Sequence, residues 1–169
     1  MSENDAVTRF VVVPQWQGSP SSRAMQLVDG AEAIAGDLPT SATVRLDVPL
    51  EAGDSLGSTV HRLSALQRVR TELEQTVRAI DDRVVVVGGD CGVAVGGIAA
   101  VQGDDLAVVW FDAHPDVNTP DTSPSGAFGG MALRSILGDG PDGLTLEPGA
   151  VPPSRCGTAA GWKIGWTIA

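Results

Sequence analysis

The sequence has 169 residues, a hydrophobic content of 43% and a formal net charge of −10, which together suit one soluble domain with a buried core. The acidic excess argues against nucleic acid or an anionic membrane as partners, because clustered Lys and Arg bind both. Two cysteines, Cys91 and Cys156, are too few for a disulfide framework. No apolar run has the length of a membrane span, and the acidic N-terminus is unlike a signal peptide, so we expect a cytoplasmic protein.

The apolar pattern predicts alternating strands and helices in the first part of the chain. Strands are expected at residues 10–13, 44–48 and 84–87, and helices at residues 22–34, 59–80 and 91–101. In the helix over 59–80, apolar residues recur three or four apart without an interrupting Gly or Pro. The strand at 84–87 consists of four valines, and a continuous apolar strand of this kind is buried on both faces, as in a parallel sheet.

A further buried strand is expected at residues 106–111, running directly into Asp112. Polar residues therefore follow strand ends, as in open α/β proteins, whose ligands bind at the carboxyl ends of the strands. No acidic residue follows Glu147, and the remainder shows neither a strand nor a helix pattern. We predict a three-layer α/β/α domain with a mainly parallel sheet over residues 1–147, and a poorly specified tail over 148–169.

The segment WFDAHPDVNTP carries the strongest chemical signal. Asp112, His114 and Asp116 are spaced by two, so in an extended chain their side chains would point the same way and converge. Mixed oxygen and nitrogen ligands suit Mn²⁺, Zn²⁺ or Fe²⁺ rather than Ca²⁺. Asp and His after a strand also serve merely to cap a helix or close a turn, and the pattern alone leaves both interpretations open.

FDAHPD resembles the DAHxD metal motif of the arginase and agmatinase (ureohydrolase) family. The preceding VVVVGGDCG resembles that family's GGDHS motif, and the following NTPDTSPSGAF resembles its arginase-type substrate loop. These motifs occur in the family's order and cover about residues 84–134. The resemblance implies an arginase-like fold, two Mn²⁺ ions and hydrolysis of a guanidinium C–N bond of arginine or a related compound, with release of urea. It also implies a homo-oligomer, since the family commonly forms trimers or hexamers.

The resemblance assigns roles by position. Asp112 would bridge the two Mn²⁺ ions. Asp116, which is also the candidate catalytic residue, and Cys91 would ligate one ion, and His114 would ligate the other. In the loop that follows, two further residues would hold the α-carboxylate and amino group of the substrate, which favours arginine-like amino acids over agmatine: Asn118 and Ser125.

The sequence departs from the family pattern in three places. Cys91 stands where the family usually has His. A thiolate is softer and favours Zn²⁺ or Fe²⁺ over Mn²⁺, while a small buried Cys opening a helix is an equally good interpretation. Gly129 stands where the arginase pattern has a proton-shuttling His, and residues 130–169 contain no SxDxDxxDP-type metal motif.

We interpret the sequence as a truncated, N-terminal portion of an arginase-like fold. Missing sheet strands would leave an exposed strand edge and apolar surface. The alternative to an active hydrolase is a non-catalytic remnant with weak or no metal binding. A nucleotide-binding domain is less favoured, because GGDCGVAVGG does not fit the G-x-G-x-x-G pattern.

Overall fold

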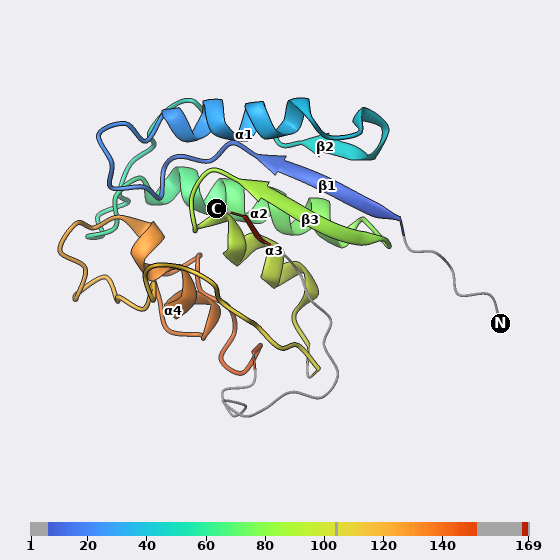
Figure 1. Ribbon diagram of the computed structural model, residues 1–169. Helices are drawn as coiled ribbons and strands as arrows, with labels where there is room; N and C mark the ends of the chain where they lie inside the picture. The colour runs from blue at the N-terminus through green and yellow to red at the C-terminus, as the bar shows by residue number, and fades with distance from the viewer. Residues whose placement is uncertain (1–6, 104, 152–166, 169) are drawn as a thin grey trace.

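A four-stranded parallel sheet forms the centre of the molecule, in a computed structural model that describes residues 7–103, 105–151 and 167–168. The strands lie in the order β2-β1-β3-β4 (Figure 1). Their bounds are Thr8–Val13 for β1, Thr43–Arg45 for β2, Arg83–Gly88 for β3 and Thr167–Ile168 for β4. All the pairings are parallel, which requires crossover connections. The prediction of a mainly parallel sheet is therefore confirmed.

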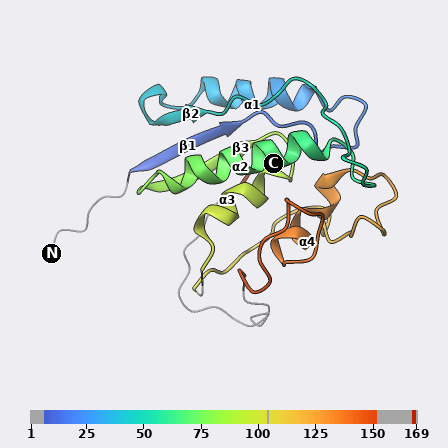
Figure 2. The ribbon, with the colours of Figure 1, turned by 180° about the vertical axis from the view of Figure 1, so that it is seen from behind.

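Helices cover both faces of this sheet, so the predicted three layers are also confirmed. Helix α1 spans Gln26–Gly36, and α2 spans Leu63–Arg78. Successive side chains of a strand point to opposite faces: Val11 of β1 packs with Leu73 of α2, whereas Val12 packs with Ala31 of α1. Figures 1 and 2 show α1 on one side of the sheet and α2 on the other.

Helix α2 begins later than its apolar periodicity predicts, because Arg62 has a left-handed backbone with φ of 60°. From this position its guanidinium group lies 4.7 Å from the centre of the Trp16 ring. It also donates to the carbonyl oxygens of Gln17 and Ser19, at 3.2 and 3.0 Å. The first predicted turn of the helix is thus replaced by a contact that fixes the loop after β1.

A second helical layer packs against α3, which spans Val93–Val101, rather than against the sheet. The short elements η2 (Phe128–Met131) and α4 (Ala132–Ile136) bury their apolar side chains with residues of α2 and α3. Helices α2 and α3 approach closely at Gly96, where an added Cβ would lie 2.9 Å from the carbonyl oxygen of Arg70. The remaining element, η1, spans Thr40–Ala42 beside β2.

The strand predicted at residues 106–111 is wrong, since this stretch joins no ladder with the described strands. It runs as an extended segment beside α3 and α4 (Figure 1). Three alternate side chains pack against the helical cluster: Leu106, Val108 and Trp110. Two residues that alternate with them, Val109 and Phe111, are 46% and 85% exposed. The apolar pattern correctly predicts that this segment is extended. It does not predict that the edge of β3 pairs with β4 rather than with residues 106–111.

This alternation is tested by the same substitution on two neighbouring residues. We expect Val108→Ala to lower the free energy of unfolding by about 1 kcal/mol, because its side chain packs against the helical cluster. Val109→Ala should change it by no more than about 0.5 kcal/mol, because this side chain is largely exposed. Urea unfolding of both variants measures the difference, and equal costs would contradict the alternation.

Two further expectations from the sequence concern membrane-spanning segments and the tail at residues 148–169. Among the helices that the structure describes, none combines the length and the apolar character needed to cross a membrane. Most of the predicted tail, residues 152–166 and 169, lies outside the described residues, so the boundary at residue 147 stays a prediction.

Candidate metal centre

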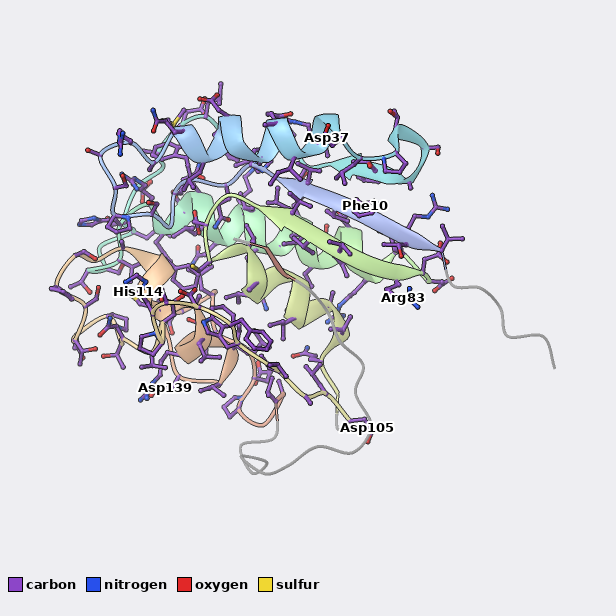
Figure 3. All side chains as sticks on the ribbon, viewed as in Figure 1. Phe10, Asp37, Arg83, Asp105, His114 and Asp139 are labelled. Carbon is purple, nitrogen blue, oxygen red and sulfur yellow. The ribbon has the colours of Figure 1, made fainter. Side chains whose placement is uncertain are left out.

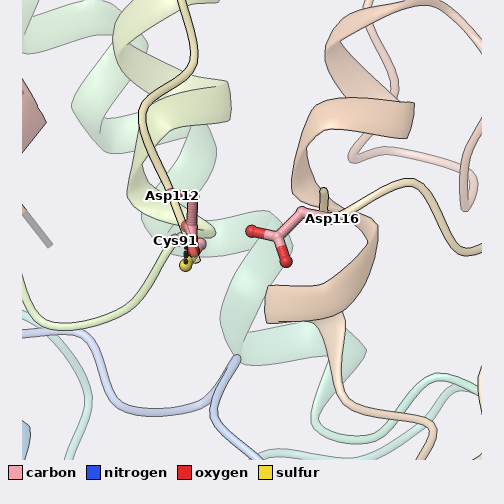
Figure 4. Close-up of side chains that lie close together, drawn as sticks. All are labelled: Cys91, Asp112 and Asp116. Atoms are coloured by element: carbon pink, nitrogen blue, oxygen red, sulfur yellow. Dashed lines mark hydrogen bonds between the residues drawn. The ribbon is translucent and has the colours of Figure 1, made fainter. Parts of the chain in front are cut away.

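Three side chains that could ligate a cation meet beyond the carboxyl end of β3. Cys91 lies in the turn between β3 and α3, and Asp112 follows the extended segment 106–111. The Cys91 thiol donates to Oδ2 of Asp112 across 3.5 Å. One ligand atom from each of Cys91, Asp112 and Asp116 lies within 4.8 Å of the other two (Figure 4).

Asp116 is turned into this group by its backbone. Its φ of 48° lies in the left-handed region, which Asp tolerates better than most residues. Its carbonyl oxygen accepts the Arg134 N–H at 3.1 Å, which ties the turn to α4. The carboxylate therefore points back toward Cys91 and Asp112 (Figure 4).

The environment of Asp116 fits a cation. The residue is only 5% exposed, and its Oδ2 has no hydrogen-bond partner among residues 7–103 and 105–151. Burial, and then the charge of Asp112, raise the pKa of this carboxyl, although the Cys91 thiol and His114 oppose the shift. A buried oxygen without a partner is costly, and a divalent cation between the two carboxylates would satisfy it.

The same surroundings keep Cys91 protonated. Burial, followed by the charges of Asp116 and Asp112, raises the pKa of its thiol. Without a cation, Cys91 is thus a hydrogen-bond donor to the carboxylates. A cation would remove the second of these causes, the repulsion by the two acids, because it neutralises their charge.

His114 does not join the other three side chains. The chain bends at residues 113–114, and the His114 N–H donates to Oδ1 of Asp112 at 2.9 Å. The imidazole Nδ1 lies 3.8 Å from the same oxygen, and the side chain is 82% exposed. Figure 3 labels His114 at the end of the molecule opposite Arg83, which begins β3. The extended arrangement expected from the spacing is therefore wrong, and the role of His114 as a ligand stays a prediction.

The two predicted substrate residues lie in the loop before η2. Asn118 is held by its backbone N–H, which donates to the carbonyl oxygen of Gly130 at 3.0 Å, and its Oδ1 accepts from Thr122 at 3.3 Å. Ser125 is exposed, and its Oγ accepts the Ala127 N–H at 3.3 Å. Both polar side chains belong to this loop. Their roles in substrate binding stay predictions.

Asp90 anchors the loops around the centre. It is 6% exposed. Its Oδ1 accepts from Gln15 Nε2 and from the Gly92 N–H, both at 2.9 Å. Its Oδ2 accepts the Gly18 N–H at 2.9 Å. Burial raises the pKa of Asp90 despite these bonds and the charge of Arg62. Asp90 thereby joins the loop after β1 to the turn that carries Cys91.

The loop after β1 is the part of the centre that sequence reasoning missed. Gln15 and Gln17 are 2% and 0% exposed, and Gln17 Nε2 donates to the carbonyl oxygen of Pro49 at 2.7 Å. The Gly18 carbonyl oxygen accepts the Gly129 N–H at 2.8 Å, which reaches η2. The available signal is the same as for Asp112, namely polar residues directly after an apolar segment that is predicted to be a buried strand.

We expect Asp90→Asn to lower the free energy of unfolding by about 2 kcal/mol. The amide keeps one acceptor oxygen for Gln15 and Gly92, but its NH₂ group faces the Gly18 N–H, a second donor. Urea unfolding measures the loss. The exposed Asp121 provides a control, since Asp121→Asn should cost no more than about 0.5 kcal/mol. Equal effects would contradict the anchoring role.

Fold and centre together define an open α/β protein with a candidate cation site at the carboxyl end of a parallel sheet. The arginase family model matches residues 17–156. The arginase of Bacillus caldovelox is 40% identical over 125 residues, which is 69% of this chain and 39% of the relative. The arginase of Entamoeba histolytica is 40% identical over 131 residues, which is 72% of this chain and 43% of the relative. The chain belongs to the arginase family.

A solved structure agrees with this assignment. The Entamoeba histolytica arginase in complex with L-ornithine superimposes with a TM-score of 0.70 and 25% sequence identity, covering 83% of this chain and 54% of that one. The chain thus spans about two fifths of the length of the two arginases above, and about half of the solved one.

Proposed function

We propose that the chain carries a metal-dependent ureohydrolase site, which hydrolyses a guanidinium C–N bond of an arginine-like amino acid and releases urea. The observation that carries this proposal is the buried Asp116 carboxylate. Its Oδ2 has no hydrogen-bond partner among the described residues, and one of its oxygens lies within 4.8 Å of ligand atoms of Asp112 and Cys91. Family membership supports the reaction class. Manganese is the ion that the resemblance implies.

The residues of this chain would hold the ions and orient the substrate. A divalent ion supplies Lewis-acid activation of water at neutral pH. Asp112 and Asp116 would hold one ion through carboxylate oxygens, and Asp112 and His114 would hold a second one. Asn118 and Ser125 would receive the α-carboxylate and amino group of the substrate. The L-ornithine bound to the related Entamoeba enzyme supports an α-amino acid at this position.

A second candidate is a non-catalytic member of the family with weak or no metal binding. Gly129, in the buried segment before α4, offers no acid or base, although the resemblance places a proton-shuttling His there. The three gathered ligands Cys91, Asp112 and Asp116 are also fewer than a pair of ions needs.

Metal content and urea release distinguish the two candidates. The purified chain is loaded with Mn²⁺, dialysed exhaustively, analysed for metal and then assayed for urea with arginine and with agmatine. We expect retained metal and urea from arginine, with both lost in Asp112→Asn and both kept in the control Asp81→Asn, which changes an exposed acid before β3. Retained metal without urea from either substrate would favour the non-catalytic candidate, and absence of metal would contradict the site itself.

A further inference from the structure

We propose that Cys91 makes the position formed by Cys91, Asp112 and Asp116 select a thiophilic ion, Zn²⁺, Co²⁺ or Fe²⁺, over Mn²⁺. This inference rests on the proposed function, since it concerns the ion that the same centre holds. It assigns the softer ion to one position only, and it leaves Mn²⁺ to the position shared by Asp112 and His114.

The sulfur atom is placed where a ligand would be needed. Cys91 lies in the turn between β3 and α3, and its Sγ is 3.5 Å from Oδ2 of Asp112. The neighbouring residues on both sides, Asp90 and Gly92, are joined by a hydrogen bond of 2.9 Å. Because this turn is fixed on both sides of Cys91, the thiol is held at the centre rather than sampling the surface.

The second observation is independent of the thiol. Asp116 is only 5% exposed, so more than nine tenths of the residue is buried. Its carboxylate points toward Cys91 and Asp112 (Figure 4). Its Oδ2 lacks a hydrogen-bond partner within the described part of the chain. The protein therefore brings together one sulfur and two carboxylate groups whose ligand atoms lie within 4.8 Å of one another, close enough to hold one cation.

The three ligands Cys91, Asp112 and Asp116 form a softer set than carboxylates alone or carboxylates with imidazole, because one of them is a sulfur atom. Thiolate ligands select Zn²⁺ and Fe²⁺ strongly, whereas Mn²⁺ prefers carboxylate, carbonyl and water. Sulfur binds zinc at about 2.3 Å in tetrahedral sites. On binding, the Cys91 S–H bond breaks, the sulfur electron pair forms the bond to the ion, and the proton leaves to solvent. The charge therefore balances, as for any thiolate site.

Cobalt absorption provides a direct readout, because a Co²⁺–thiolate bond gives a sulfur-to-metal charge-transfer band that oxygen and imidazole ligands do not give. The metal-free chain of 169 residues is titrated with Co²⁺. We expect the band in the wild type and in Cys156→Ser, which removes the other thiol. The band should be absent in Cys91→Ser and in Cys91→His.

Competition then measures selectivity. We expect Cys91→His to lower the preference for Zn²⁺ over Mn²⁺ by about tenfold or more, which is the scale on which even outer partners of a ligand change metal affinity. A band that persists in Cys91→Ser, or Co²⁺ bound without a band in the wild type, would overturn the inference while leaving the metal site of the proposed function intact. Failure of the wild type to retain Co²⁺, Zn²⁺ or Mn²⁺ would overturn both.

Discussion

Replacing Asp116 with asparagine should stabilise the metal-free chain and abolish the stabilisation that a divalent ion confers. In the metal-free state the Asp116 carboxylate is buried beside Asp112, and its Oδ2 has no partner among the described residues. Asparagine removes the charge, and its NH₂ group can donate to the Asp112 carboxylate. Asparagine also tolerates the left-handed backbone, with φ of 48°, so the turn is kept.

We expect a gain of about 1 kcal/mol in the metal-free free energy of unfolding, at the lower end of the cost of an unsatisfied buried polar group. The wild type should gain about 2.7 kcal/mol from an ion present at about 100 times its Kd. In Asp116→Asn this gain should disappear, because the amide lacks the negative charge of the carboxylate and Asp112 is then the one carboxylate left among the three gathered ligands.

Urea unfolding with a chelator, and then with added Mn²⁺ or Zn²⁺, measures both effects on one variant. Asp121→Asn is the matched control, because Asp121 is an exposed acid of the same loop and should show neither effect. Loss of stability in the metal-free Asp116→Asn chain would mean that the protein itself satisfies this carboxylate. The main support for a cation site would then be removed.

The sheet could be predicted because the amino-acid composition of its long strands is by itself typical of buried strands. The valine runs of β1 and β3 are buried from both faces, since Val11 and Val12 contact helices on opposite sides, and such runs have few other uses in a soluble domain. The extended segment at residues 106–111 has similar composition, yet it pairs with none of the described strands. Composition therefore predicts that a segment is extended, but pairing depends on which other segments reach its edge.

The candidate centre was predicted in part, and for a reason that the structure corrects. Asp112 and Asp116 lie close together, but not through the alternation of an extended chain. The bend at residues 113–114 removes the alternation, and the left-handed backbone of Asp116 restores the convergence. Neither event is visible in the spacing of the motif. The contribution of Cys91 depends on the packing of Asp90, two of whose partners, Gln15 and Gly18, lie more than 70 positions away in the chain.

The glycine that follows β3 determines whether these distant segments can meet. An added Cβ at Gly89 would lie 1.8 Å from the carbonyl oxygen of Gln15, far inside van der Waals contact. Relief of this clash would require the loop after β1 to move. The backbone of Gly89 fixes the position of the Cβ, and the oxygen belongs to the backbone of Gln15. That loop carries the Gly18 N–H that Asp90 accepts at 2.9 Å and the Gly18 carbonyl oxygen that binds the Gly129 N–H at 2.8 Å.

We expect Gly89→Ala to lower the free energy of unfolding by about 3 kcal/mol, the upper end of the usual cost of overpacking, and to lower metal retention with it.

The same substitution at Gly30, in the exposed middle of α1, should change the free energy of unfolding with the opposite sign. There an added Cβ meets no described atom within 4 Å, and Ala should stabilise the helix by about 0.5–1 kcal/mol. Urea unfolding of both variants, with metal content measured in parallel, tests this contrast. If Gly89→Ala matched Gly30→Ala in sign, the close approach of the two backbones could not be what assembles the centre. With opposite signs and metal lost only in Gly89→Ala, the packing of β3 against the loop after β1 would be the physical condition for bringing Cys91 to the carboxylates.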